Sequence, residues 1–337
     1  MDRCSENRSK IVEFLPLGKS GLKVSRLCLG CMSYGSSQAR PWILDEEAAL
    51  PFYRQAIDAG INFFDTADLY SQGKSEEVTG RALHKLGIPR EHIVIATKVF
   101  YPTGSTPNEQ GTAKKHVRHA IDGSLRRLGV DHIDLYQIHR YDRTTPMEET
   151  LAALTDLIKQ GKVLYIGASS MYAWELARFL HIARTNGFAQ FVSMQNHYNL
   201  VYREEEREMI PFCQEENIGV IPWSPLARGF LAGNRPRAEH GETTRGKTDA
   251  SARRLYYQES DYRVVDRVTD LAKKRGISNA QIALAWMLHK PAITSPIIGA
   301  TKPHHLEEAV KALDVHLSDD EIKYLEEPYQ PHAVLGM

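Results

Sequence analysis

Short apolar runs alternate with amphipathic stretches over most of the chain. Strands are predicted where apolar residues run together, and helices where they recur with a period near 3.6 residues. The predicted strands span 24–30, 61–66, 93–98, 134–139, 163–168, 191–196, 219–223 and 295–299. The predicted helices lie near 46–59, 75–86, 113–128, 147–160, 172–186, 204–217, 262–290, 303–313 and 318–327, the C-terminal pair occupying 303–327. The helical stretch 262–290 is split at Gly276, with Ser278 as a cap. Eight strand–helix units predict a closed (β/α)8 TIM barrel of the α/β class.

Two segments depart from this repeat. Residues 11–24 (IVEFLPLGKSGLKV) predict a β-hairpin with its turn at 18–21, which we expect to plug the N-terminal mouth of the barrel. Residues 229–260 form a long polar stretch after strand seven. Long loops of this kind are usually lids, binding loops or solvated segments.

Composition agrees with one large domain, and we expect 1–337 to form a single barrel. Of the 337 residues, 42% are hydrophobic, which is enough for a substantial core. Lys+Arg and Asp+Glu are both 42, so no overall charge points to nucleic acid or an anionic membrane. No run approaches the roughly 20 apolar residues of a spanning helix, and the start lacks a secretion signal. We expect a cytoplasmic location.

The four cysteines do not suggest a disulfide framework in a chain of this length. Cys28 and Cys31 have the spacing of a redox or zinc motif, but they lie on the first predicted strand, where residues three apart point to opposite sides. No second pair of ligands accompanies them. We therefore expect no metal site.

Four residues with acid–base chemistry lie at the ends of three consecutive predicted strands. Asp65 and Tyr70 belong to the run INFFDTADLY, Lys98 to IVIATKV and His139 to IDLYQIH. The C-terminal ends of parallel strands converge on one face of a barrel, so these four side chains are expected to meet in one pocket.

Each of the four has a plainer explanation when taken singly. Asp65 suits a turn or a helix cap, Tyr70 the rim of a pocket, and a lone His139 is most often structural. Lys98 directly follows an apolar run, where its burial is costly without a partner. Their joint placement favours a catalytic site.

The combination fits proton donation. A phenol has a pKa of about 10, and we expect the Lys98 cation to lower the pKa of Tyr70 toward neutrality. Asp65 would keep Lys98 charged, while His139 would orient a carbonyl oxygen that Tyr70 protonates. No side chain supplies a hydride, so a nicotinamide cofactor is implied. No G-x-G-x-x-G motif opens a helix after a strand, which argues against a Rossmann site.

These motifs resemble those of the aldo-keto reductases. The resemblance is carried by FFDTADLY, ATK, QIH, GASS (167–170), SMQNHYNL (193–200), PWSPLARGFLAG (222–233) and PIIGATKPHHLEEA (296–309), and it covers 24–309. The chain is most similar to bacterial members with NFFDTA and PWSPLARG, some of them named 1-deoxyxylulose-5-phosphate synthases. It resembles the potassium-channel β-subunits more distantly.

The resemblance implies NADPH-dependent reduction of aldehydes and ketones by the tetrad Asp65, Tyr70, Lys98 and His139. Nicotinamide contacts are implied for Ser169, Ser170, Gln195 and Trp223, where Ser170 replaces the usual asparagine and Trp223 has barrel packing as its plainer role. Pyrophosphate contacts are implied for Ser224, Leu226, Gly229 and Leu231. Adenosine contacts are implied for Gly299, Thr301, Lys302, His305 and Glu308. Lys302 is expected to hold a 2′-phosphate, so NADPH is preferred and NADH remains possible.

The substrate is expected to be a small carbonyl compound. Candidates for the pocket wall are Met32, Tyr34, Trp42, Phe100, Tyr101, Tyr141 and Tyr198. Arg140 either pairs with an anionic group of the substrate or forms a salt bridge to a loop carboxylate such as Asp142. The segment 229–260 is expected to cover the cofactor phosphates, the alternative being a solvated loop.

A cofactor-binding regulatory subunit that senses the redox state of the nicotinamide is the alternative to an enzyme. The tetrad is compatible with both. A barrel hydrolase or isomerase would need a nucleophile or metal cluster at the strand ends, and the sequence offers none. The pattern makes no prediction of oligomeric state.

Overall fold

The computed structural model describes residues 12–233 and 244–335. Its main sheet has eight parallel strands in the order β10-β3-β4-β5-β6-β7-β8-β9. They are β3 (Cys28–Gly30), β4 (Phe63–Asp65), β5 (Val94–Val99), β6 (Ile133–Ile138), β7 (Val163–Ser169), β8 (Ser193–Gln195), β9 (Gly219–Val220) and β10 (Ile297–Ile298). Parallel bridges from Val220 to Ile293 and from Trp223 to Ile297 join the two ends of this order. The predicted (β/α)8 barrel is confirmed.

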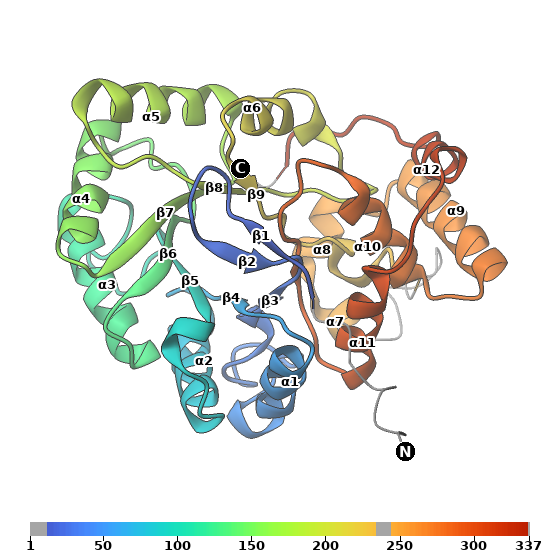
Figure 1. The fold of residues 1–337 in the computed structure, drawn as a ribbon, viewed down its shortest axis with the longest axis horizontal. Coiled ribbons are helices and arrows are strands. Elements are labelled where there is room, and N and C mark those ends of the chain that lie inside the picture. The colour runs from blue at the N-terminus through green and yellow to red at the C-terminus, as the bar shows by residue number, and fades with distance from the viewer. Residues whose placement is uncertain (1–11, 234–243, 336–337) are drawn as a thin grey trace, which may run out of the picture.

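Helices follow the strands and surround the sheet (Figure 1). They are α1 (Glu46–Asp58), α2 (Lys74–Lys85), α3 (Lys114–Leu128), α4 (Met147–Lys159), α5 (Ala173–Asn186), α6 (Met209–Glu215), α9 (Glu259–Arg275), α10 (Asn279–His289), α11 (Pro303–Ala312) and α12 (Asp319–Glu326). The predicted split after α9 is confirmed. Gly276 ends this helix with φ +67°, and the Ser278 hydroxyl accepts a hydrogen bond from Gln281 N at 3.2 Å.

An antiparallel hairpin of β1 (Phe14–Pro16) and β2 (Lys23–Ser25) lies across the N-terminal mouth of the barrel, as predicted (Figure 1). Leu17 and Val24 are fully buried in the cluster that fills the barrel interior. Gly18 has φ +57°, and a Cβ at this position would lie 2.5 Å from the carbonyl oxygen of Val192, just before β8. Only glycine fits this contact without a shift in the backbone.

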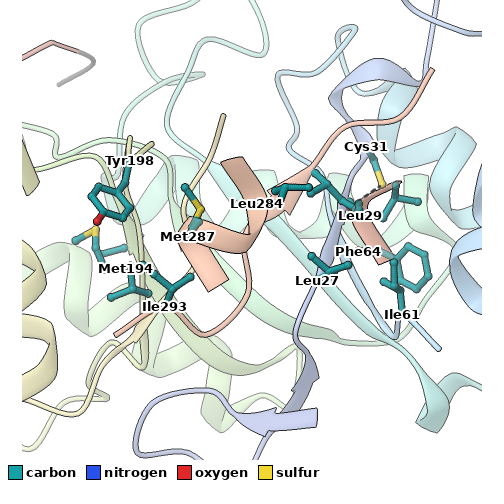
Figure 2. Close-up of a cluster of buried hydrophobic side chains, with 14 of the residues drawn as sticks. Leu27, Leu29, Cys31, Ile61, Phe64, Met194, Tyr198, Leu284, Met287 and Ile293 are labelled. Atoms are coloured by element: carbon teal, nitrogen blue, oxygen red, sulfur yellow. Dashed lines mark hydrogen bonds between the residues drawn. The ribbon is translucent and has the colours of Figure 1, made fainter. Parts of the chain in front are cut away.

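A second and larger core lies between the strands and the helices. Along β3 and β4 the side chains alternate, so that Cys28 and Phe63 face the interior while Leu29 and Phe64 belong to the outer core. Figure 2 shows part of this outer core. Leu284 of α10 lies beside Leu29 of β3, and Phe64 of β4 belongs to the same cluster. Burial of both faces explains why the strands read as continuous apolar runs.

The segment after strand seven contains two helices that were not predicted. They are α7 (Thr244–Thr248) and α8 (Ala250–Leu255), and α9 begins three residues before its predicted start at 262. Arg228 Nε donates to Asp249 Oδ2 at 2.6 Å, which ties α8 to the end of the barrel. The remaining part of the predicted cofactor-covering loop, 234–243, lies outside the described residues.

No helix within 12–233 and 244–335 is long and apolar enough to cross a membrane.

Candidate active site

The structure brings Asp65, Tyr70, Lys98 and His139 together at the C-terminal end of the barrel. Asp65 is the last residue of β4, Lys98 lies near the end of β5, and His139 directly follows β6. The ammonium of Lys98 donates to Asp65 Oδ1 at 2.5 Å, to the carbonyl oxygen of Thr66 at 2.7 Å and to Tyr70 Oη at 3.2 Å. Three acceptors therefore compensate a cation with no solvent exposure.

Aromatic rings hold the imidazole of His139 from two sides. Its ring centroid lies 5.8 Å from that of Tyr70 and 4.9 Å from that of Tyr101, both in edge-to-face geometry. Phe100 packs edge-on against Tyr101 at 5.2 Å. The Nδ1 atom of His139 is buried without a hydrogen-bond partner among the described residues. The hydroxyl-bearing ring of Tyr70 and the imidazole of His139 thus lie among aromatic side chains.

The protonation states follow from burial and from neighbouring charge. Burial raises the pKa of Tyr70 above its ordinary value, although Lys98 acts in the opposite direction. The expected net lowering of this pKa is therefore wrong for the protein alone, because loss of hydration outweighs the attraction of one cation that Asp65 already neutralises. Burial lowers the pKa of Lys98, but Asp65 and Tyr70 together raise it beyond its ordinary value. Tyr70 stays protonated and Lys98 stays charged at neutral pH.

The pKa of His139 lies well below its ordinary value because of burial first and then the charges of Lys98 and Arg140. A neutral imidazole has one N–H donor and one acceptor. It can therefore orient a carbonyl oxygen without itself delivering the proton.

Sequence reasoning missed Gln137, which supports the tetrad from β6. Its Nε2 donates to Asp65 Oδ2 at 3.0 Å, and Gln195 Nε2 donates to the same oxygen at 2.9 Å. The two amides also contact each other, at 3.1 Å from Gln195 Nε2 to Gln137 Oε1. The signal was present, since Gln137 precedes His139 by two residues on the same strand face.

Three of the expected nicotinamide ligands are adjacent, at the ends of β7 and β8. Ser169 Oγ donates to the carbonyl oxygen of Gln195 at 2.8 Å, and Ser170, with φ +44°, follows it. The side-chain nitrogen of Gln195 is turned toward Asp65. Ser169, Ser170 and Gln195 thus form a polar edge next to the tetrad.

The indole of Trp223 joins this edge. Its Nε1 donates to Ser170 Oγ at 3.1 Å, and its ring stacks on His197 with centroids 4.2 Å apart and planes at 8°. His197 stacks in turn on Tyr202 at 4.2 Å, while its Nε2 lies 2.6 Å from Tyr256 Oη. The indole is half-buried, and one of its faces is covered by His197.

The expected pyrophosphate loop has an irregular backbone. Ser224, Arg228 and Gly229 have φ values of +55°, +57° and +93°. Leu226 is half-buried, whereas Leu231 is fully buried, backbone included. Backbone N–H groups in such conformations form concave sites for anions.

The expected adenosine site lies at the start of α11. Lys302 is the exposed N-cap residue, and Thr301 N donates to His305 Nδ1 at 3.3 Å. Burial, with help from His304 and Lys302, lowers the pKa of His305 to about 4, so this ring is neutral and Lys302 is the cation here. Glu308 lies six residues beyond Lys302, nearly two turns along the helix. Gly299 precedes the segment, and a Cβ there would meet only Ser33 Oγ, at 3.7 Å.

Two residues predicted for the pocket wall lie elsewhere. Tyr34 is fully buried against Phe52 and Tyr53 of α1, and its hydroxyl donates to the carbonyl oxygen of Ala300. Tyr198 packs on Trp286 and donates to Glu206 Oε1 at 2.5 Å. Figure 2 shows Tyr198 beside Met194 and Met287 in the outer core. Both predictions are wrong, because the chain after each strand turns these rings under a helix.

Among the other candidates, Met32 is half-buried in the turn after β3, and Trp42 is buried. Tyr141 packs its ring against Phe179 of α5 at 5.7 Å. Phe100 contacts Tyr101, and Tyr101 contacts His139. These two rings form an aromatic wall beside the tetrad.

A family model described as the aldo/keto reductase family matches residues 26–330. The chain belongs to this family. It is 47% identical to versiconal hemiacetal acetate reductase of Aspergillus parasiticus over 96% of this chain and 98% of that protein. It is 43% identical to aldo-keto reductase dtxS3 of Metarhizium robertsii, covering 96% of this chain and 93% of that protein. It is 41% identical to aldo-keto reductase AMT2 of Alternaria alternata, over 95% of this chain and 92% of that protein.

Membership of the aldo/keto reductases makes this protein an oxidoreductase that reduces carbonyl groups, in a family that generally uses NAD(P)H. The regulatory alternative is not favoured by these reductase relatives. They come from fungi, so they give no support to the expected likeness to bacterial members or channel subunits.

Proposed function

We propose that this protein reduces aldehydes or ketones with NADPH, and that Tyr70 is the general acid. The observation that carries the proposal is the position of the Lys98 ammonium, which contacts both Asp65 and the Tyr70 hydroxyl. The nicotinamide would supply the hydride. The side chains of this chain would orient the carbonyl group and manage the proton.

Each side chain of the tetrad has a distinct task in this proposal. Tyr70 is protonated at rest because burial raises its pKa, so it has a proton to give when negative charge develops on the carbonyl oxygen. Lys98 then stabilises the phenolate that Tyr70 becomes, and Asp65 keeps Lys98 in place. The neutral His139 orients the oxygen through an N–H group.

The residues present fit a nicotinamide dinucleotide. Trp223 offers a half-buried ring beside the polar edge of Ser169 and Ser170, and the positive-φ backbone near Gly229 suits a pyrophosphate. Lys302 at the N-terminus of α11 combines a side-chain cation with the positive end of a helix, which suits a 2′-phosphate. These features support NADPH over NADH.

The substrate is proposed to be a small carbonyl compound with an aromatic or otherwise flat apolar part, because Phe100 and Tyr101 line the side of the site next to His139. A cytoplasmic location is part of the same proposal.

The test is oxidation of NADPH or NADH with a panel of aldehydes and ketones, followed by the loss of reduced-nicotinamide absorbance. Wild-type protein should turn over at least some of them, preferably with NADPH. Tyr70→Phe should lower kcat by roughly 10² or more and leave NADPH binding unchanged.

The control for this experiment is Tyr324→Phe on α12, whose ring lies under Arg267 and far along the chain from the tetrad. It should behave like the wild type. Near-normal turnover by Tyr70→Phe would show that another group donates the proton. A wild type that binds NADPH but reduces nothing would favour a sensing role.

A further inference from the structure

The side chain of Arg140 is turned toward the tetrad. It follows His139 at the end of β6, and its Nη1 donates to the carbonyl oxygen of His139 at 2.6 Å. Its guanidinium carbon lies 5.8 Å from the ring centroid of Tyr101, the ring that contacts the His139 imidazole. Burial raises the pKa of Tyr70, and the charge of Arg140 is one of the smaller influences that oppose this rise. A guanidinium held over an aromatic ring keeps its planar set of donors in a fixed orientation.

Arg140 has no carboxylate partner among the residues of 12–233 and 244–335. Asp142, the acidic residue nearest in sequence, accepts instead from Thr112 N at 2.8 Å and from the hydroxyls of Thr144 and Thr145 at 2.6 and 2.7 Å. The salt bridge considered from the sequence is therefore not formed. Arg143, only three residues further, does have a partner, with Nη2 at 2.6 Å from Glu175.

None of the described groups that act on the pKa of Arg140 is a carboxylate. After burial, which lowers this pKa, come Tyr101 and Tyr70, which raise it, and the like charge of Arg254 on α8, which lowers it. Arg140 is also partly removed from water, and burial lowers its pKa. A half-buried cation without a counter-ion costs free energy that an anionic ligand would recover.

We propose that Arg140 is a specificity-determining residue that pairs with an anionic oxygen group of the substrate, a carboxylate or a phosphate. The proposal rests on the function above, because it takes the substrate carbonyl to lie at Tyr70 and His139. Arg140 then selects aldehydes or ketones that carry a negative charge on the part of the molecule away from the reacting carbon. The aromatic wall of Phe100 and Tyr101 accommodates the apolar part between the two ends.

The experiment compares kcat/KM, with NADPH, for three aldehydes that share one ring: 4-carboxybenzaldehyde, 4-formylphenyl phosphate and the neutral methyl 4-formylbenzoate. Wild type should prefer at least one anion over the ester by about tenfold or more, as expected for charge-assisted hydrogen bonds to a guanidinium. The preferred anion identifies the source of the charge. Arg140→Gln should abolish the preference, and the ratio within each variant cancels any general loss of turnover.

Arg143→Gln is the matched control. It removes a nearby arginine that already has a carboxylate partner, and it should keep the preference for the anion. If Arg140→Gln loses all turnover, binding of benzoate to the protein loaded with NADP+ replaces the kinetic comparison. Wild type and Arg143→Gln should bind benzoate, and Arg140→Gln should bind it at least tenfold more weakly.

Equal kcat/KM for anionic and neutral aldehydes in the wild type would overturn the proposal. So would an unchanged preference, or unchanged benzoate binding, in Arg140→Gln. A higher KM for NADPH in that variant, without a change in substrate preference, would assign Arg140 to the cofactor instead. Failure of the wild type to reduce any aldehyde would count against the proposed function and not against this assignment alone.

Discussion

Lys98 illustrates how far residue-level reasoning reaches from sequence. A lysine that directly follows an apolar run needs a buried partner, and the structure supplies Asp65, Thr66 and Tyr70. The sequence could not give the direction of the Tyr70 pKa, because that depends on the balance between burial and charge in three dimensions. Gln137 was missed although its place two residues before His139 on the same strand face was visible in the sequence, and its hydrogen bond to Asp65 became apparent only in the structure.

At this scale the proposed 2′-phosphate contact of Lys302 is directly testable. Lys302→Ala should raise the KM for NADPH several-fold more than the KM for NADH, because only NADPH carries the charge that the ammonium would meet. Steady-state kinetics with both cofactors measure the difference. Lys311→Ala, which removes an exposed lysine from the last turn of the same helix, is the control. Equal effects on the two cofactors would rule out the contact.

At the scale of elements, strands and long helices were predictable because each carries a clear apolar period. The strands were found in the right order, and Ser278 and Gly276 marked the break between α9 and α10. The short helices α7 and α8 were missed, since five or six residues of polar sequence hold too little periodicity to recognise. Tyr34 and Tyr198 were misplaced because a residue beyond a strand can turn back under the helical layer.

The hairpin is an element whose role can be tested apart from the chemistry. Leu17→Ala should lower the free energy of unfolding by about 2–4 kcal/mol, because its fully buried side chain fills the barrel interior. The kcat for a good substrate should remain unchanged, since the tetrad lies at the opposite mouth. Urea denaturation and steady-state assays measure the two effects. Phe14→Ala on the same hairpin removes a ring that is 41% exposed and should have a much smaller effect on stability.

For the whole molecule, one buried carboxyl group couples stability to pH. Asp68 is 2% exposed, and neither of its carboxyl oxygens has a hydrogen-bond partner among the described residues. Burial, followed by the charge of Glu76, raises the pKa of Asp68 to about 8, with Arg127 acting in the opposite direction. The native state therefore keeps a proton on Asp68 up to about pH 8, whereas the unfolded chain loses it near pH 4.

The sign of the effect follows from this difference. Between about pH 4 and pH 8 the native state binds more protons than the unfolded state, so this group makes the protein less stable as pH rises. Asp68→Asn should remove that loss and raise the free energy of unfolding at pH 8 by up to roughly 5 kcal/mol, the free energy equivalent of about four pKa units. Urea denaturation at roughly pH 5, 6.5 and 8, which span this window, gives the free energy of unfolding against pH for the wild type and for Asp68→Asn.

Asp58→Asn on the exposed face of α1 is the control and should follow the wild type. Parallel curves for wild type and Asp68→Asn would mean that Asp68 is ionised in the native state, with water or another group compensating its charge.

The hairpin at the closed mouth also decides how the molecule can be attached to a solid support. Gly21 in its turn is exposed, and a side chain added there would meet no atom within 4 Å. Coupling to a bead or an electrode through this turn would leave the opposite mouth of the barrel facing the solution (Figure 1). Lys98, near the end of β5, lies at that mouth together with Tyr70. Substrate and coenzyme would then reach every immobilised molecule from the same side.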